Sequence, residues 1–296
     1  MVLHMWLLVL PVVLVLSALR LSSAATGAVG GLTFNSVFAP GMLLQRGGST
    51  KIWGYGAIPN GTVRISIDGL TSAGVSVATP TGDWQVTLPT LVETNSTSLH
   101  AADGHTTAVL TDVAIGELLL CGGQSNMGYG MCGALSVEQT PAEAMATLAP
   151  VRYLFVHGSG PGGGSGTGKA ESNCNGVHYI TPNGTWFRPD GRANNNTGGA
   201  SAICMLTASA LHKHLGGRVP VGAIESCQSA TNVQPWTPAA PGRPTSEDGP
   251  LFAQWIRPLL PMKFRAVLWY SSKFVLPWSP NLPLFVLSTR LSEIPC

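Results

Sequence analysis

Ser125 stands where the sequence could support nucleophilic catalysis. An apolar run of strand length, Leu118–Cys121, ends at two glycines, and a serine flanked by the amides of Gln124 and Asn126 follows at once. Glycines let the backbone turn sharply after a strand, and the next segment can begin a helix whose first N–H groups point at the site. Such groups can hold the oxyanion that forms when a serine attacks an ester carbonyl. The alternative is a strand that ends in a glycine-rich turn with a surface serine, and this window alone does not separate the two.

Two regions of different pattern must position this serine. Over residues 32–111, short runs rich in Val, Ile and Thr alternate with turn signals such as Asn60-Gly61 and Asp103-Gly104, which is typical of a small antiparallel β-sandwich. Over residues 112–270, strand-length apolar runs surround a helical pattern at Ser201–His214, in which Ile203, Leu206, Ala210 and Leu211 share the apolar face. Continuous apolar runs suit parallel strands that are buried on both faces, so we expect an α/β fold in which Ser125 lies beyond the carboxyl end of a strand. The runs are Leu118–Cys121, Val151–Val156, Val219–Ile224 and Ala266–Tyr270.

The N-terminus and the charge balance indicate a secretory protein. Residues 1–25 contain the apolar stretch Met5–Leu19, followed by the small residues Ser22–Ala25, which predicts a signal peptide and a mature chain that begins near Thr26. An uncleaved anchor is the alternative; after cleavage we expect no stable membrane span, and a secreted or lysosomal (vacuolar) location. Net charge is +2 with no basic cluster, which argues against nucleic acid as a partner. Four sequons predict glycosylation, at Asn60, Asn95, Asn183 and Asn195.

We expect no cofactor and no metal. None of the six cysteines has Cys-x-x-Cys spacing, which argues against zinc and thioredoxin chemistry, although some should form disulfides of open connectivity in an oxidising compartment. The stretch Gly158–Gly163 matches the dinucleotide pattern, but Pro161 and the glycine-serine run up to Gly168 are typical of a loop.

Several segments, in order, resemble one family. The most specific is Gly122-Gly123-Gln124-Ser125-Asn126-Met127, and others are Val37–Arg46, Ile52–Gly56, Gly82–Pro89 and Val219–Ser226. Over roughly residues 32–270 the chain resembles the sialate O-acetylesterases, secreted or lysosomal carbohydrate esterases related to the SGNH hydrolases. The resemblance implies an SGNH (flavodoxin-like) three-layer parallel sheet over residues 112–270, with the β-sandwich region before it. The implied partner is an O-acetylated carbohydrate or sialoglycan.

The same resemblance implies roles for individual residues. Ser125 is the implied nucleophile, and backbone N–H groups at Ser125, Ser229 and Ala230 are the implied oxyanion donors. We expect substrate contacts from Gln124, Asn126 and Trp236.

The chain also departs from the family. Ser229-Ala230-Thr231 stands where Gly-Gly-Thr is usual, and Ser271 follows Tyr270 where the family continues with Gln-Gly-Glu. The late Asp-x-x-His motif is missing, and residues 271–296 show no family resemblance, so we expect a divergent or truncated tail and an inactive form. His157, which closes the second apolar run, is the candidate internal base and His178 the next; for both, a solvated loop histidine is the alternative.

Two further hypotheses stay open. The chain could be a non-catalytic secreted glycan-binding protein in which Trp236 and Trp269 stack on sugar, although core packing is the other role for both. It could also be a truncated product whose fourth strand is left as a bare sheet edge. The carboxylate of a bound sialic acid would need a cationic partner such as an arginine. Nothing in the sequence selects among the candidates Arg152, Arg188, Arg192 and Arg243.

Overall fold

The structure, a computed structural model, describes residues 31–68, 70–129, 148–156, 186, 188, 200–228, 231–270 and 285–288. The expected signal peptide and most of the tail therefore lie outside the described residues. No helix in the described ranges is long and apolar enough to cross a membrane.

The first part of the chain is built from antiparallel strands. One three-stranded sheet contains β1 (Thr33–Phe34), β3 (Lys51–Tyr55) and β6 (Trp84–Thr87). A second layer contains β4 (Thr62–Ile67), β5 (Leu70–Val77) and β7 (Thr94–Ala102). Alternate residues of β4 and β6 are buried, as expected for strands with one face on a core.

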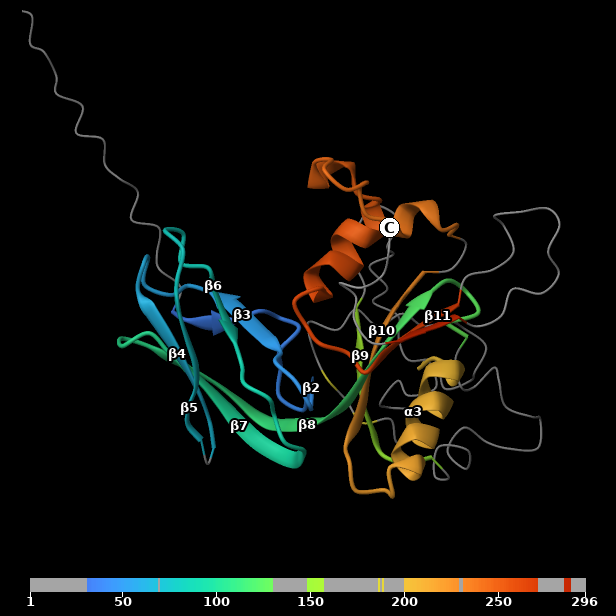
Figure 1. Cartoon of the computed structure of the whole chain (residues 1–296), viewed down its shortest axis with the longest axis horizontal. Helices are drawn as coiled ribbons and strands as arrows, with labels where there is room; N and C mark the ends of the chain where they lie inside the picture. The colour runs from blue at the N-terminus through green and yellow to red at the C-terminus, as the bar shows by residue number, and fades with distance from the viewer. Residues whose placement is uncertain are drawn as a thin grey trace, which may run out of the picture.

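The strand β8 (Thr107–Gly123) joins the two parts of the molecule (Figure 1). Its first half pairs antiparallel with β7, and its second half pairs parallel with β10 and β11. Between the halves, Asp112 has a left-handed φ of 53°, and β2 (Leu43–Gln45) pairs parallel with the residues just beyond it. The expected boundary between residues 111 and 112 thus falls inside one continuous strand.

The second part is a mixed sheet of the α/β class. Its order is β9 (Val151–Phe155), β10 (Val221–Cys227), β8, β11 (Ala266–Tyr270) and β12 (Phe285–Ser288). The first four strands are parallel, and β12 runs antiparallel to β11. The expectation of a bare edge at the fourth strand was therefore wrong, because a segment of the tail pairs there.

Helical segments lie on both faces of this sheet (Figure 1). The helix α3 (Ala202–His214) packs in one cluster with Leu119 and Cys121, while the intervening residues of β8 pack in the main core with Leu259. Successive side chains of a strand point to opposite faces, so α3 and the segment η5 (Phe252–Ile256) to η6 (Arg257–Leu259) cover different faces. A disulfide between Cys121 and Cys204 fixes α3 to the sheet.

The buried face of α3 differs from the one we expected. Leu206 is 50% exposed, whereas Ala202, Cys204, Met205 and Ala208 are buried. Small side chains let the helix approach the sheet closely, and the disulfide fixes its rotation.

Candidate active site

Two glycines end β8 because neither position has room for a side chain. A Cβ on Gly122 would lie 2.4 Å from the ring of Trp269, and one on Gly123 would lie 2.1 Å from the carbonyl oxygen of Tyr270. Gly123 also has a φ of 134°, which L residues rarely adopt. The backbone of β8 can therefore lie against β11 and turn only because both residues are glycine.

The turn that follows exposes Ser125. The Gln124 N–H donates to the Tyr270 carbonyl at 3.0 Å, and the N–H groups of Met127 and Gly128 donate to the Gln124 carbonyl at 2.8 and 3.0 Å. Ser125 and Asn126 are exposed, and Met127 is buried. The N–H groups of Ser125 and Asn126 have no acceptor in the described part of the chain. They are available to a ligand at this turn.

Ser125 follows a central strand at the carboxyl edge of the sheet. Cys227 at the end of β10 and Tyr270 at the end of β11 both stand opposite Gly123 in the register. Gln228, the next residue after β10, donates its N–H to the Gly123 carbonyl at 3.0 Å. Residues 125–127 form a turn, and the helix that we expected after them would continue into residues 130–147, outside the described residues.

A buried carboxylate, Glu225, lies on the α3 side of this edge. Its Oε2 accepts a hydrogen bond from the Tyr153 hydroxyl and one from the Ser201 N–H at 3.0 Å, and its Oε1 accepts from the Cys227 thiol at 3.0 Å. Burial raises the pKa of Glu225 above its usual range, and these donors oppose the rise. Burial, followed by the nearby Glu225 charge, also raises the pKa values of Tyr153 and Cys227.

This network supports the turn that carries Ser125. The hydroxyl of Ser201 caps α3 by accepting from the Cys204 N–H at 3.2 Å and lies 3.5 Å from the Met127 sulfur. The Ala202 N–H donates to the Tyr129 carbonyl at 2.9 Å. Glu225 was not among the predicted site residues. The available signal was a carboxylate at the end of the apolar run Val219–Ile224, because a buried carboxylate needs hydrogen-bond partners.

The three residues expected to contact substrate differ in exposure. Asn126 is exposed, whereas Gln124 is 3% exposed and its Nε2 has no hydrogen-bond partner among the described residues. Trp236 is buried, packs edge-on against Trp255 and Trp269, and donates its Nε1–H to the Thr231 hydroxyl at 3.0 Å. Trp236 and Trp269 thus pack against each other, and contact of either ring with a sugar stays a prediction.

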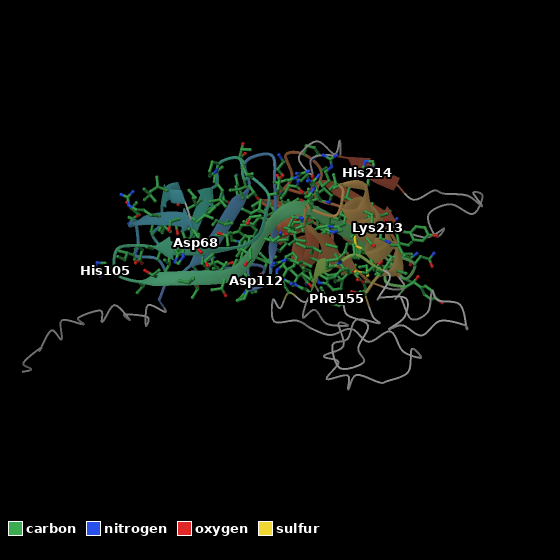
Figure 2. The ribbon with its side chains drawn as sticks, turned by 90° about the horizontal axis from the view of Figure 1, so that it is seen from below. Asp68, His105, Asp112, Phe155, Lys213 and His214 are labelled. Carbon is green, nitrogen blue, oxygen red and sulfur yellow. A yellow bond between two sulfur atoms is a disulfide. The ribbon has the colours of Figure 1, made fainter. Side chains whose placement is uncertain are left out.

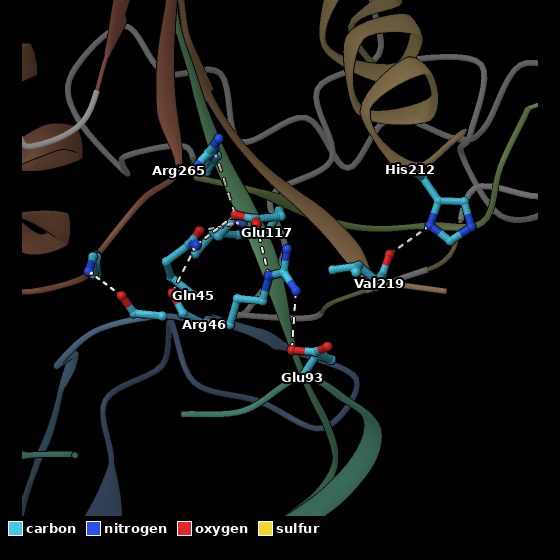
Figure 3. Close-up of polar contacts among 10 residues, drawn as sticks. Gln45, Arg46, Glu93, Glu117, His212, Val219 and Arg265 are labelled. Atoms are coloured by element: carbon cyan, nitrogen blue, oxygen red, sulfur yellow. Dashed lines mark hydrogen bonds and ion pairs between the residues drawn. The ribbon is translucent and has the colours of Figure 1, made fainter. Parts of the chain in front are cut away.

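The described histidines lie away from Ser125. His100 contacts Asp68 at 3.1 Å in the β part, and His212 contacts the Val219 carbonyl at 2.8 Å at the amino end of β10 (Figure 3). His105 is at the far tip of the β part, well separated from Phe155 at the carboxyl end of β9 (Figure 2). The remaining expected site residues lie outside the described residues: His157, His178, Ser229, Ala230, Asn183 and Asn195.

Two of the four predicted glycosylation sites lie in the described part of the chain. Asn60 and Asn95 are exposed, as a glycan would need. The described ranges hold no group of three or more His, Cys, Asp or Glu that could bind a metal ion.

Arg152 has a structural role that excludes it as a sugar partner. Its guanidinium donates to the carbonyls of Met42, Asn95 and Asp112 and pairs with the Asp112 carboxylate at 2.7 Å. Arg152 is 6% exposed, and burial lowers its pKa while Asp112 opposes that shift. It therefore fixes β9 to the bend of β8 and to the β part.

Comparison with known proteins identifies a fold shared with an esterase. No protein-family model matches the chain, and no curated protein sequence does either. The chain is similar to the crystal structure of a novel carbohydrate acetylesterase from Xanthomonas citri, with a TM-score of 0.63 and 26% sequence identity. The match covers 81% of this chain and 51% of the other, so the chain spans about half the length of that structure. The fold is thus that of an α/β protein similar to a carbohydrate acetylesterase.

Proposed function

We propose that this chain is a carbohydrate O-acetylesterase that uses Ser125 as its nucleophile. One observation carries the proposal: an exposed serine follows a central parallel strand, with the free N–H groups of Ser125 and Asn126 beside it. The similarity to a carbohydrate acetylesterase supports the substrate class. The finer assignments, an SGNH-type three-layer domain and a sialate-type substrate, belong to the same proposal.

The chemistry follows from the geometry of the turn. The Ser125 Oγ attacks the acetyl carbonyl while a base takes its proton, and the N–H groups of Ser125 and Asn126 hold the developing oxyanion. The sugar oxygen then leaves with a proton, and water hydrolyses the acetyl-enzyme to acetate. Because the late Asp-x-x-His motif is missing, we expect little or no turnover by this form unless His157 supplies the base. Ser229 and Ala230 are the proposed further N–H donors.

Acetate release tests the proposal. The substrates are acetylated xylan and O-acetylated sialic acid, and the variants are Ser125→Ala and His157→Ala. Ser246→Ala is the matched control, because Ser246 is also exposed but lies in the short turn η4 (Thr245–Glu247). Losing a triad member lowers kcat by about four to six orders of magnitude in well-studied triads. Turnover that survives Ser125→Ala would refute the assignment.

The same assay separates the glycan-binding alternative. A binding protein would retain sugar affinity and release no acetate from either substrate. An organophosphonate label on a serine other than Ser125 would also contradict the proposed nucleophile.

We further propose that the chain is secreted after cleavage near Thr26 and glycosylated at Asn60 and Asn95. N-terminal sequencing of secreted material, with mass spectrometry before and after glycosidase treatment, tests both. An intact Met1 in a cytosolic fraction would contradict secretion.

A further inference from the structure

A polar pocket lies at the opposite edge of the sheet from Ser125. It has a volume of about 510 Å³ and lies among β2, the start of the parallel half of β8, and the segment that leads into β11 (Figure 3). Glu117 lines it, and Gly123 lies about 20 Å further along β8 at ~3.3 Å per residue. The pocket is therefore separate from the proposed catalytic turn.

The charged groups on the floor of the pocket are paired with one another. Glu117 is 4% exposed, and its carboxylate accepts from the Gln45 amide at 2.7 Å and from the Arg46 guanidinium at 2.9 Å. Arg46 also pairs with Glu93 at 3.1 Å, so one cation bridges both carboxylates of the pocket. The hydrogen bond to Glu117 is the largest effect that raises the pKa of Arg46. These groups carry one positive and two negative charges, so the floor has a net charge of −1 and no cation left for a ligand.

The rim carries two cations that remain open to a ligand. The Lys263 Nζ donates to the Gly47 carbonyl at 3.2 Å and has no carboxylate partner among the described residues. The Arg265 Nε is 4.0 Å from Glu117, and this side chain is 61% exposed. At that distance and exposure the pair contributes little. The pocket thus holds three cations against two carboxylates, with the excess positive charge at Lys263 and Arg265.

The dimensions and chemistry of the pocket indicate its ligand. A volume of this order is in the range of small-molecule sites and exceeds what a single small anion would fill. The exposed oxygens of Glu93 and the Gly47 carbonyl can accept from hydroxyl groups, and the planar fork of an arginine fits an acid group. Leu91, Val92 and Phe264 add apolar surface to the lining, which the C–H face of a sugar can contact. A ring that carries hydroxyls and one negative charge matches these features.

We propose that this pocket is a second, non-catalytic saccharide site that binds an acidic sugar residue, with the acid group on Lys263 and Arg265. The choice of a sugar rests on the proposed function, whereas the charge and the position do not. Such a site would hold an acidic polysaccharide chain while Ser125 acts on another residue of it. The acid group could be a carboxylate or a sulfate ester, both of which carry one negative charge.

Isothermal titration calorimetry on the Ser125→Ala protein tests this site without any turnover. The probes are tetragalacturonate, its fully methyl-esterified neutral form, and a sulfated galactose tetrasaccharide of equal length. We expect Lys263→Gln and Arg265→Gln each to raise the Kd for the bound acidic probe about tenfold, as loss of one charge-assisted hydrogen bond requires. The matched control is Arg64→Gln, which removes an exposed cation on β4 and should leave the Kd unchanged.

The outcomes are distinct. Binding of tetragalacturonate alone assigns a carboxylate, and binding of the sulfated probe alone assigns a sulfate. Equal affinity for the neutral probe, unchanged affinity in both rim variants, or no binding of either acidic probe would overturn the proposal. Because Ser125 is already replaced, failure here leaves the esterase proposal standing. Failure of the esterase assay would remove the reason for choosing a sugar, but it would not change the binding measured at this site.

Discussion

Gly123→Ala should uncouple the turn of Ser125 from β11. The new methyl group would lie 2.1 Å from the Tyr270 carbonyl oxygen, 2.7 Å from its carbon and 3.0 Å from its nitrogen. All three are backbone atoms, so no side-chain rotation relieves the overlap. Either β11 moves away, which lengthens the hydrogen bond from the Gln124 N–H to Tyr270, or the turn itself shifts.

Two separate effects set how much Gly123→Ala lowers the free energy of unfolding. A non-glycine residue at a φ of 134° costs about 1–3 kcal/mol, and overpacking at a site without space costs about 1–3 kcal/mol more. Gly104→Ala isolates the first effect, because Gly104 has a φ of 89° with no heavy atom within 4 Å of the added Cβ. We therefore expect Gly123→Ala to lower the free energy of unfolding by about 2–6 kcal/mol, and Gly104→Ala by about 1–3 kcal/mol.

Urea unfolding followed by tryptophan fluorescence measures this difference, and acetate release measures its effect on Ser125. Gly123→Ala should also reduce turnover far more than Gly104→Ala does. If the two variants unfold at the same urea concentration, the close approach of β8 to β11 does not shape the turn, and our account of Ser125 positioning would be wrong.

Three further perturbations follow from the buried contacts. Burial raises the pKa of Glu225 above its ordinary value of 4.5, so the folded protein favours the neutral form. The free energy of unfolding should therefore fall as the pH rises above about 4.5. Glu225→Gln should remove this pH dependence. A pH titration of urea unfolding that shows identical slopes for both proteins would contradict this. Replacing Cys121 and Cys204 together by alanine opens a crosslink with a sequence separation of 83 and should cost about 4 kcal/mol in urea unfolding; a loss under 1 kcal/mol would count against it. Arg152→Gln should cost about 3–5 kcal/mol because it leaves buried acceptors unpaired, whereas Arg243→Gln, at an exposed pair, should change the free energy of unfolding by under ~0.5 kcal/mol; equal effects would rule out the structural role of Arg152.

The parallel strands could be predicted from the sequence because their signal is local. Continuous apolar runs mark β9, β10 and β11. All residues of β9 and β10 are buried, and β11 is partly buried. The same pattern located Ser125 at a carboxyl end, since the glycines directly follow the run. The order of the strands could not be predicted, because pairing depends on contacts between segments far apart in sequence. Neither the pairing of β12 with β11 nor the continuation of β8 across both parts has a local signature.

Charged residues inside apolar runs were the signal that we did not use. Arg152, Glu117 and Glu225 each stand in or beside a run that predicts a buried strand, and each is under 10% exposed. A buried charge is costly unless it is paired, so such a residue predicts a fixed partner elsewhere in the chain. The identity of that partner is not local: Asp112, Gln45 and Ser201 come from other elements.

The three buried titratable side chains together explain how a two-part molecule can hold one serine in place. Arg152 fixes β9 to the β part through Asp112, and Glu117 fixes β8 to the loop after β2 through Arg46. Glu225 fixes β10 to the start of α3. Each contact joins a different strand of the parallel sheet to a neighbouring element, so β8, β9 and β10 cannot slide without breaking a buried polar contact. The position of the Ser125 turn therefore depends on Arg152, Glu117 and Glu225. Substitutions at these residues should disturb the turn even though none of the three belongs to it.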